Sequence, residues 1–369
     1  MRSVIPVENN DPQAALRGLL KRLLEKEVVE AVLVPMATPG GAVTPALVTE
    51  AGLLDAAVPL APVMGLNAAR VAGPVSVREP RGRIAVVLRP CEYRALVELV
   101  KLQQASLDDM LTVVVDCLGT YTVPDYTTML ADGGVGQERL WAAARSGDMA
   151  PREGYAFRDA CQMCEKPHAE GGTIQVELFG ADLASGLPVV LPDDMATTLG
   201  LSAAAADGQR PAVVERVVAA RTKARDERFA AIRQRLAEGN VGGVFAACVR
   251  CHNCMTACPI CYCKTCLFKS PVFDHEPVQY MNWARRKGAY RLPGDTMLFH
   301  LTRLNHMVLS CIGCGVCSDA CPADLPVAQV FRAIGQQVQA EFDYVPGRSV
   351  EEPLPLITFK ENEWLEVGE

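Results

Sequence analysis

Seven cysteines stand between residues 248 and 266 of a chain that contains 15 in all. Cysteines at this density form disulfides, bind zinc or hold iron–sulfur clusters. The first residues, MRSVIPVENNDPQ, reach Asn and Asp before any apolar stretch, unlike an export signal. We therefore expect a cytoplasmic protein, in which metal or redox chemistry explains the cysteines better than disulfides.

One spacing, C-x2-C-x2-C-x3-C-P, occurs twice: CVRCHNCMTACP begins at Cys248 and CIGCGVCSDACP at Cys311. A [4Fe–4S] cluster binds four thiolates, and in two-cluster ferredoxins the fourth cysteine of such a run binds the other cluster. Zinc sites usually pair C-x2-C knuckles instead, and two zinc sites are the alternative. We predict one [4Fe–4S] cluster on Cys248, Cys251, Cys254 and Cys321, and a second on Cys311, Cys314, Cys317 and Cys258.

Three further cysteines, Cys261, Cys263 and Cys266, follow the first run with the spacing C-x-C-x2-C. They supply only three thiolates, one fewer than a cluster of this kind binds. They either pack beside the clusters, take part in redox chemistry, or bind another metal with a ligand from elsewhere.

The last four cysteines lie in the first half of the chain. RIAVVLRP and LTVVVDC are apolar runs that predict buried strands, with Cys91 and Cys117 at or just beyond their ends. Open α/β sheets bind ligands at the carboxyl ends of their strands. The C-x2-C pair at residues 161 and 164 can close over the same point. We predict a third [4Fe–4S] cluster on Cys91, Cys117, Cys161 and Cys164, with four unrelated buried cysteines as the alternative.

The elements around these cysteines indicate two kinds of domain. Amphipathic patterns at residues 12–29 and 92–105 alternate with the apolar strands, which predicts an α/β domain with a mainly parallel sheet. Helical patterns at 277–291 and 295–309 separate the two runs and indicate an α-helical two-cluster ferredoxin-like domain. We divide the chain into residues 1–205 (α/β), 206–240 (helical connector), 241–335 (ferredoxin-like) and 336–369 (a tail expected to contact another subunit).

The bulk composition excludes two classes of partner. Half of the residues are hydrophobic, but no apolar run approaches the ~18 residues that a membrane span needs. The formal charge of −7 argues against a nucleic-acid partner, since such proteins usually carry basic patches.

Three segments of the first half carry a family resemblance: RPCEYRALVELVKLQ, DCLGTY and RDACQMCEKPHAEGGTIQVELFG. In this order they resemble the beta subunits of coenzyme F420-reducing hydrogenases and formate dehydrogenases, over roughly residues 15 to 180. The tail segment FDYVPGRSVEEPLPL extends the resemblance toward the bacterial formate-dehydrogenase-associated branch. The resemblance implies that Cys91, Cys117, Cys161 and Cys164 bind a cluster beside a flavin that exchanges electrons with a mobile carrier.

The expected flavin segment departs from the family. A Gly-Gly-x-x-Thr sequence belongs before the first helix, where this chain has NNDPQAAL. In this chain GGAVT comes later, after EAVLVP, which predicts a short buried strand. Backbone N–H groups of a glycine-rich turn can bind phosphate. Gly40, Gly41 and Thr44 are therefore the candidate residues for FAD, and an ordinary turn is the alternative.

Two redox functions and one structural function fit these patterns. The first is an iron–sulfur electron-transfer subunit of a formate dehydrogenase, hydrogenase or heterodisulfide-reductase-like complex. The second is a flavin-dependent reductase subunit that exchanges electrons with F420, NAD(P)H or ferredoxin, and the third is a zinc scaffold. The chain shows no molybdopterin, nickel or catalytic-triad pattern, so we assign no catalytic residue and expect a non-catalytic or flavin-bearing subunit.

Overall fold

The computed structural model describes residues 1–78, 82–205 and 208–358. Its sheet has the strand order β1-β7-β6-β5-β4-β2-β3. Strands β2, β4, β5 and β6 are parallel, whereas β3 at one edge and β7 and β1 at the other are added by antiparallel pairs. The predicted α/β class with a mainly parallel sheet is confirmed, and the antiparallel edges are an addition. The strands are β1 (Arg2–Pro6), β2 (Ala31–Ala37), β3 (Val43–Val48), β4 (Ile84–Leu88), β5 (Met110–Val115), β6 (Ile174–Val176) and β7 (Gly186–Val190).

The central strands β4 and β5 are apolar except for Thr112, because helices cover both faces of the sheet. Every residue of β4 and β5 is buried. Along β4, Ala85 and Val87 face a core with α1 (Pro12–Glu25), while Val86 and Leu88 face one with α2 (Ala69–Ser76) and α3 (Pro90–Lys101). Helices α1 and α3 match the two predicted amphipathic segments.

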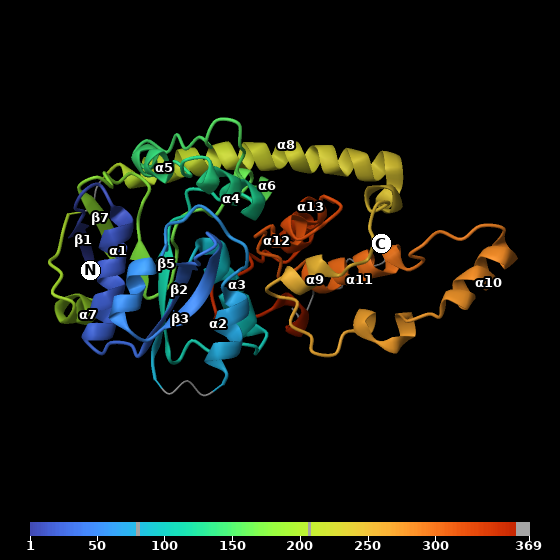
Figure 1. Ribbon diagram of the computed structural model, residues 1–369, viewed down its shortest axis with the longest axis horizontal. Coiled ribbons are helices and arrows are strands. Elements are labelled where there is room, and N and C mark those ends of the chain that lie inside the picture. Colours follow the sequence, from blue (N-terminus) through green and yellow to red (C-terminus); the bar gives the residue numbers. More distant parts are fainter. Residues whose placement is uncertain (79–81, 206–207, 359–369) are drawn as a thin grey trace.

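Short helices follow β5, and a long one leaves the sheet. They are α4 (Val123–Ala131), α5 (Gln137–Ala144), α6 (Asp159–Gln162), α7 (Asp193–Thr198) and α8 (Arg210–Val244). Helix α8 runs from the α/β part to the C-terminal part (Figure 1). Val213 and Val217 pack in the α/β core, whereas Phe229 and Ile232 pack in the C-terminal core. The predicted connector is therefore a helix that belongs to both cores.

The C-terminal region is helical and rich in cysteine. Its helices are α9 (Asn253–Ala257), α10 (Pro277–Lys287), α11 (Thr296–Met307), α12 (Val316–Asp319) and α13 (Val327–Glu341), and short 3-10 turns lie at Ala51–Ala56, Leu267–Lys269, Pro271–Phe273 and Pro355–Ile357. Helices α9 and α12 begin at equivalent points of the two cysteine runs and contact each other. This pairing brings the two runs together.

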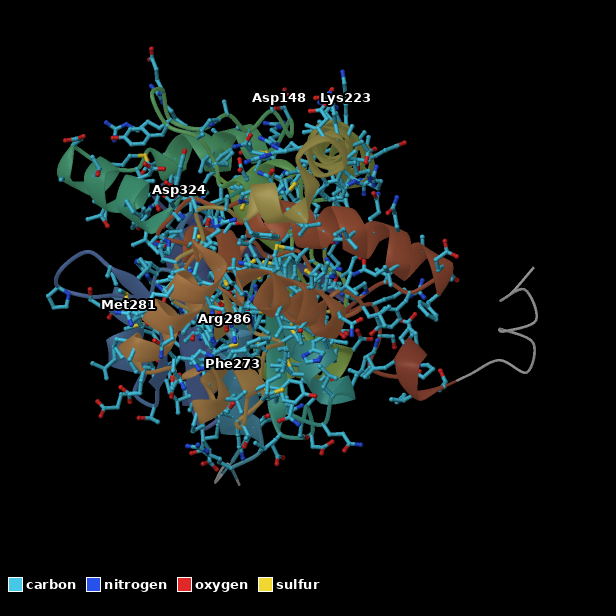
Figure 2. All side chains as sticks on the ribbon, turned by 90° about the vertical axis from the view of Figure 1, so that its right-hand side faces the viewer. Asp148, Lys223, Phe273, Met281, Arg286 and Asp324 are labelled. Atoms are coloured by element: carbon cyan, nitrogen blue, oxygen red, sulfur yellow. The ribbon has the colours of Figure 1, made fainter. Side chains whose placement is uncertain are left out.

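We call residues 271–292 the arm, because α10 lies away from the rest of the molecule (Figure 1). Helix α10 has no buried residue. Val278 is 59% exposed and Met281 56% exposed. Figure 2 looks onto this end and labels Phe273, Met281 and Arg286. The arm thus presents apolar and basic side chains outward.

The chain after α13 folds back onto α3. The Tyr344 hydroxyl and the Gly347 N–H each donate to Glu98 Oε1 at 2.7 Å. Arg94 Nε donates to the Pro346 carbonyl at 2.9 Å. The first part of the predicted tail is therefore held within this chain, and residues 359–369 lie outside the described residues. Across the described ranges, no helix has both the length and the apolar character of a bilayer span.

Candidate metal centres and an adjoining cavity

The first predicted ligand set lines one small cavity. Cysteines 248, 251 and 254 come from the first run, and Cys321 comes from the end of the second. His300 lies against this set, with Nε2 at 3.3 Å from Cys248 Sγ and its ring stacked on Phe245. Burial, followed by the charge of Arg303, lowers the pKa of His300 to about 4. This contact joins residues 52 positions apart, so the spacing of the cysteines does not predict it.

In the second predicted set, the cysteine contributed by the other run is Cys258. Burial, and next the charge of Cys258, raise the pKa of Cys314 to about 12. The same two causes come first for Cys311, and Cys258 also raises the pKa of Cys317. The structure thus places the last cysteine of the first run beside three cysteines of the second.

The third predicted set also shares a cavity, lined by Cys91, Cys117, Cys161 and Cys164, and Cys314 of the second set lies on the same cavity. Cys91 is in the first turn of α3, where Glu92 Oε2 accepts from the Arg89 N–H at 2.8 Å. Cys117 follows β5, and burial followed by the charge of Cys161 raises its pKa to about 12. The second and third sets are therefore neighbours.

A buried arginine joins these neighbouring sets. Arg158 donates from Nη2 to the Cys314 carbonyl at 2.9 Å and from Nε to Asp319 Oδ2 at 2.6 Å. Its Nη1 donates to Thr120 Oγ1 at 3.2 Å, and that hydroxyl lies 3.1 Å from Cys161 Sγ. Gly315 has φ +77°, and a Cβ there would collide with Ala160. Only glycine permits this close approach of the two loops.

The donor chemistry of the three sets fits iron–sulfur clusters. Buried thiols whose pKa is raised to about 12 stay protonated at neutral pH without metal, so metal binding must release protons. Within the described ranges, no three His, Cys, Asp or Glu side chains are grouped as ligands of one ion. A four-iron cluster holds its thiolates farther apart than a single ion does, because the irons and sulfides lie between them.

The three extra cysteines differ in their surroundings, and Cys261 is the one near Cys258. Burial, followed by the charge of Cys258, raises the pKa of Cys261 to about 11. Cys263 is exposed, and Cys266 Sγ lies 3.7 Å from Met255 Sδ.

A buried carboxylate, Asp116, positions Cys117 and the loop after Cys164. Its Oδ1 accepts from the Ala169 N–H at 2.6 Å, and its Oδ2 accepts from the N–H groups of Leu178 and Phe179 at 2.7 and 3.0 Å. Arg210 at the start of α8 donates to both oxygens, at 2.5 and 3.1 Å. The hydrogen bonds of Asp116 therefore connect the end of β5, the loop after Cys164 and the start of α8.

Replacing Asp116 with Asn is expected to lower the free energy of unfolding by about 3 kcal/mol, because the new NH2 group meets only donors. Chemical denaturation measures this loss. The control is Asp182→Asn, whose partner Arg145 lies 3.8 Å away in solvent. It should cost less than about 1 kcal/mol. Equal losses in the two variants would contradict the anchoring role of Asp116.

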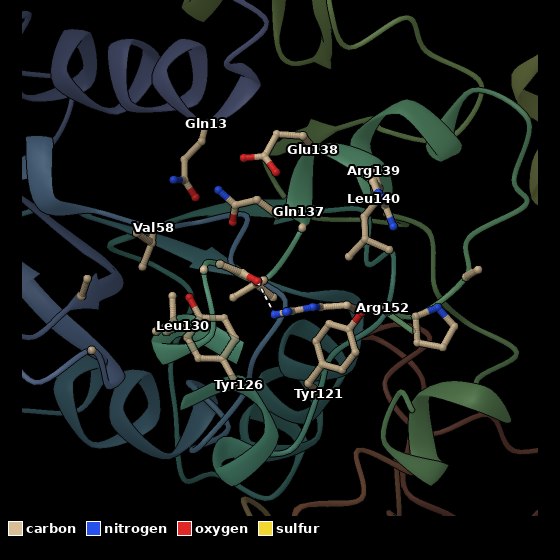
Figure 3. A pocket seen from close by; sticks show the side chains of 18 residues that line it. Gln13, Val58, Tyr121, Tyr126, Leu130, Gln137, Glu138, Arg139, Leu140 and Arg152 are labelled. Carbon is tan, nitrogen blue, oxygen red and sulfur yellow. Dashed lines mark hydrogen bonds between the residues drawn. The ribbon is translucent and has the colours of Figure 1, made fainter. Parts of the chain in front are cut away.

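A cavity of about 660 Å³ lies near the third set, between α4, α5 and the β2–β3 turn (Figure 3). Of the predicted flavin residues, Gly41 lines it, whereas Gly40 and Thr44 do not. A second glycine segment, Gly133 to Gly136, lines it as well. The signal for this segment in the sequence is ADGGVGQERL, in which three glycines directly precede a helix. The prediction of flavin residues did not include it.

One arginine, Arg152, fixes the position of the 133–136 glycine segment through hydrogen bonds to backbone carbonyls. Arg152 donates from Nη1 to the carbonyls of Gly134 and Met129 at 2.6 and 3.2 Å, and from Nη2 to the Asp132 carbonyl at 3.1 Å. Its own N–H donates to Tyr121 Oη at 2.8 Å. Arg152 and Tyr121 both line the cavity (Figure 3). Volumes of this size accept organic cofactors.

A smaller cavity adjoins both the large cavity and the third cysteine set. Cys117 and Arg89 line the smaller cavity at one end. Gln137 and Leu140 of α5 line both the smaller and the large cavity. A group bound in the large cavity would therefore lie close to the Cys117 side of the third set.

Comparison with known proteins gives distant relatives. No protein-family model matches the sequence. The F420-dependent formate dehydrogenase 1 subunit beta of Methanococcus maripaludis is 25% identical over 94% of this chain and 94% of its own length. The F420-dependent formate dehydrogenase subunit beta of Methanocaldococcus jannaschii is 22% identical over 74% of this chain and 75% of its own length. A chain of the F420-reducing [NiFe] hydrogenase complex from Methanosarcina barkeri covers 62% of this chain at 11% identity, with a TM-score of 0.44.

Proposed function

We propose that this chain, a distant homologue of the F420-dependent formate dehydrogenase beta subunits over most of its length, is the iron–sulfur electron-transfer subunit of an oxidoreductase complex. It binds three [4Fe–4S] clusters on the three cysteine sets and a flavin in the large cavity. The observation that carries the proposal is the contiguity of these sites. Cys314 of the second set lies on the cavity of the third, and Cys117 of the third lies on the cavity that adjoins the flavin site.

The order of the sites defines an electron path. Helices α9 and α12 hold the first and second sets together, and Arg158 and Gly315 hold the second set against the third. Each step would pass between neighbouring sites, whose cysteines are buried or half-buried apart from the exposed Cys251. The chain's contribution is to keep the sites in this order and at short range.

The residues of the large cavity are suited to bind rather than to react. Backbone N–H groups of the 133–136 segment lie before α5 and can receive a phosphate group. Tyr121 and Tyr126 supply aromatic faces to the cavity. Arg152 keeps the segment in place through its carbonyl contacts. A flavin there would supply exchange between one-electron clusters and a two-electron carrier such as F420.

The partner that oxidises the substrate is a different polypeptide, and we place its contact on the arm. Residues 277–292 contain four Arg or Lys and no Asp or Glu, in a chain of net charge −7. The same segment exposes Val278, Met281 and Leu292. A partner surface that is acidic and apolar would complement it.

Anaerobic purification of the chain with its partners tests this function. We expect about twelve irons and an equal amount of acid-labile sulfide per chain, absorption near 400 nm and about one extractable flavin. Colourless, sulfide-free protein would reject the clusters and favour the zinc alternative. Iron without flavin would leave the electron-transfer role and reject our use of the large cavity.

The second candidate is a reductase that needs no partner, and the large cavity, which adjoins the smaller cavity lined by Cys117, favours it. The isolated chain would then reduce F420, NAD(P)+ or ferredoxin with an artificial electron donor, and its rate would equal that of the complex. We expect the isolated chain to carry electrons between artificial donor and carrier but to oxidise neither formate nor hydrogen.

A further inference from the structure

Arg303 is a buried cation in the middle of α11. Arg303 is 3% exposed, and its guanidinium lies over the Phe331 ring, 4.8 Å from the ring centroid. Nη2 donates to the Cys254 carbonyl at 2.9 Å. Its side chain is thus fixed between an aromatic ring and the first cysteine run.

The remaining donors of this guanidinium have no acceptor. Nε and Nη1 of Arg303 are buried and lack a hydrogen-bond partner among the described residues. Leaving buried charged donors unpaired costs several kcal/mol, about 1–3 or more for each group. Buried, unpaired donors of this kind indicate an acceptor that the protein chain itself does not supply.

The cysteines identify where that acceptor belongs. The Phe331 ring under the Arg303 guanidinium belongs to the core that contains Cys254, and Cys317 packs against the same core. Cys254 belongs to the first ligand set, and Cys317 belongs to the second. Arg303 therefore lies close to both sets.

Two other arginines near the cysteines differ from Arg303. Arg158 is paired with Asp319, and Arg332 is paired with Glu165. No carboxylate of the described residues forms an ion pair with Arg303 within 4 Å. Among the described residues its charge therefore has no carboxylate partner, and anionic clusters bound by the neighbouring cysteine sets would balance it.

We propose that Arg303 is a positioning residue shared by the first and second clusters, an inference that rests on the proposed function. Nε–H and Nη1–H donate to cluster sulfurs, and the cation stabilises the more negative reduced state of both clusters. Hydrogen bonds to sulfur and net charge are two of the quantities that set cluster potentials. One residue thereby raises both potentials together and keeps them matched for transfer between the two clusters.

The test is a redox titration of the anaerobically purified complex, followed by EPR, with Arg303→Gln, Arg303→Lys and Arg235→Gln. In Arg303→Gln, we expect the ratio of reduced to oxidised form at a fixed potential to fall at least tenfold for both clusters, or 59 mV for one electron. Arg303→Lys keeps the charge but loses the planar donors, so both potentials should fall by less. Arg235 is an exposed cation on α8, and solvent screens it, so Arg235→Gln should change neither.

The outcomes separate this inference from the proposed function. Wild-type protein without iron and sulfide would refute both. Intact clusters with unchanged potentials in the Arg303 variants, or a shift in only one cluster, would overturn the inference and leave the function standing. Loss of the clusters in both Arg303 variants would also overturn it, because Arg303 would then have a structural role.

Discussion

Replacing Cys258 with alanine is expected to destroy the cluster held by the second cysteine run and to spare the cluster of its own run. Cys258 lies beside Cys311, Cys314 and Cys317, whose pKa values its charge raises. Iron analysis and EPR should show the loss of up to about four of about twelve irons per chain. The α/β cluster should be retained.

Two double variants test which cluster Cys258 binds. Cys258→Ala with Cys314→Ala removes two ligands of one cluster, so the pair should lose no more iron than the worse single variant. Cys258→Ala with Cys248→Ala removes ligands of two clusters and should lose up to about eight irons. If the first pair loses as much iron as the second, the crossed arrangement is wrong.

Replacing Gly136 with valine is expected to abolish flavin binding and to leave the iron content unchanged. Gly136 has φ +70° at the start of α5, and its Cβ position meets no atom within 4 Å because it faces the large cavity. A valine side chain would occupy space that the flavin needs. We expect at least a tenfold loss of flavin affinity, about 1.4 kcal/mol, measured by fluorescence titration of the flavin-depleted protein.

The chain contains a matched control for backbone strain. Gly200, after α7, has φ +67° and also meets no atom within 4 Å, but it does not line the cavity. Valine costs about 1–2 kcal/mol of left-handed strain at either position. Gly200→Val should therefore lose similar stability and retain flavin. Equal flavin content in the two variants would show that the flavin binds elsewhere.

Much of the fold was readable from local patterns. The apolar runs before Cys91 and Cys117 became β4 and β5, because strands covered on both faces need no polar residue. The long charged segment after residue 210 became α8, with Val213 and Val217 in one core and Phe229, Ile232 and Val244 in the other. The edge strands β1, β3 and β7 escaped prediction. Strand β1 pairs with β7, which is distant in the sequence, and β3 has only one buried residue.

The flavin residues show the limit of motif reasoning. GGAVT attracted attention because it follows a predicted strand, yet only Gly41 reaches the cavity. The second glycine segment, 133 to 136, faces Gly41 across the cavity although about ninety residues separate them. A pocket assembled from two loops has no single local signature, because each loop alone is an ordinary turn.

The amino-acid sequence by itself determined the chemistry of this protein: the number of thiols, their spacing in two matching runs, and the strand ends that carry Cys91 and Cys117. Spacing is a local property, and short loops present three thiolates to one site whatever surrounds them. Only the tertiary structure decided which sites are neighbours and which cations lie among them, as with Arg303 close to both runs and Arg158 between Cys314 and Thr120. Those contacts join residues 38 to 156 positions apart, and packing of whole elements, rather than any pattern in the chain, brings them together.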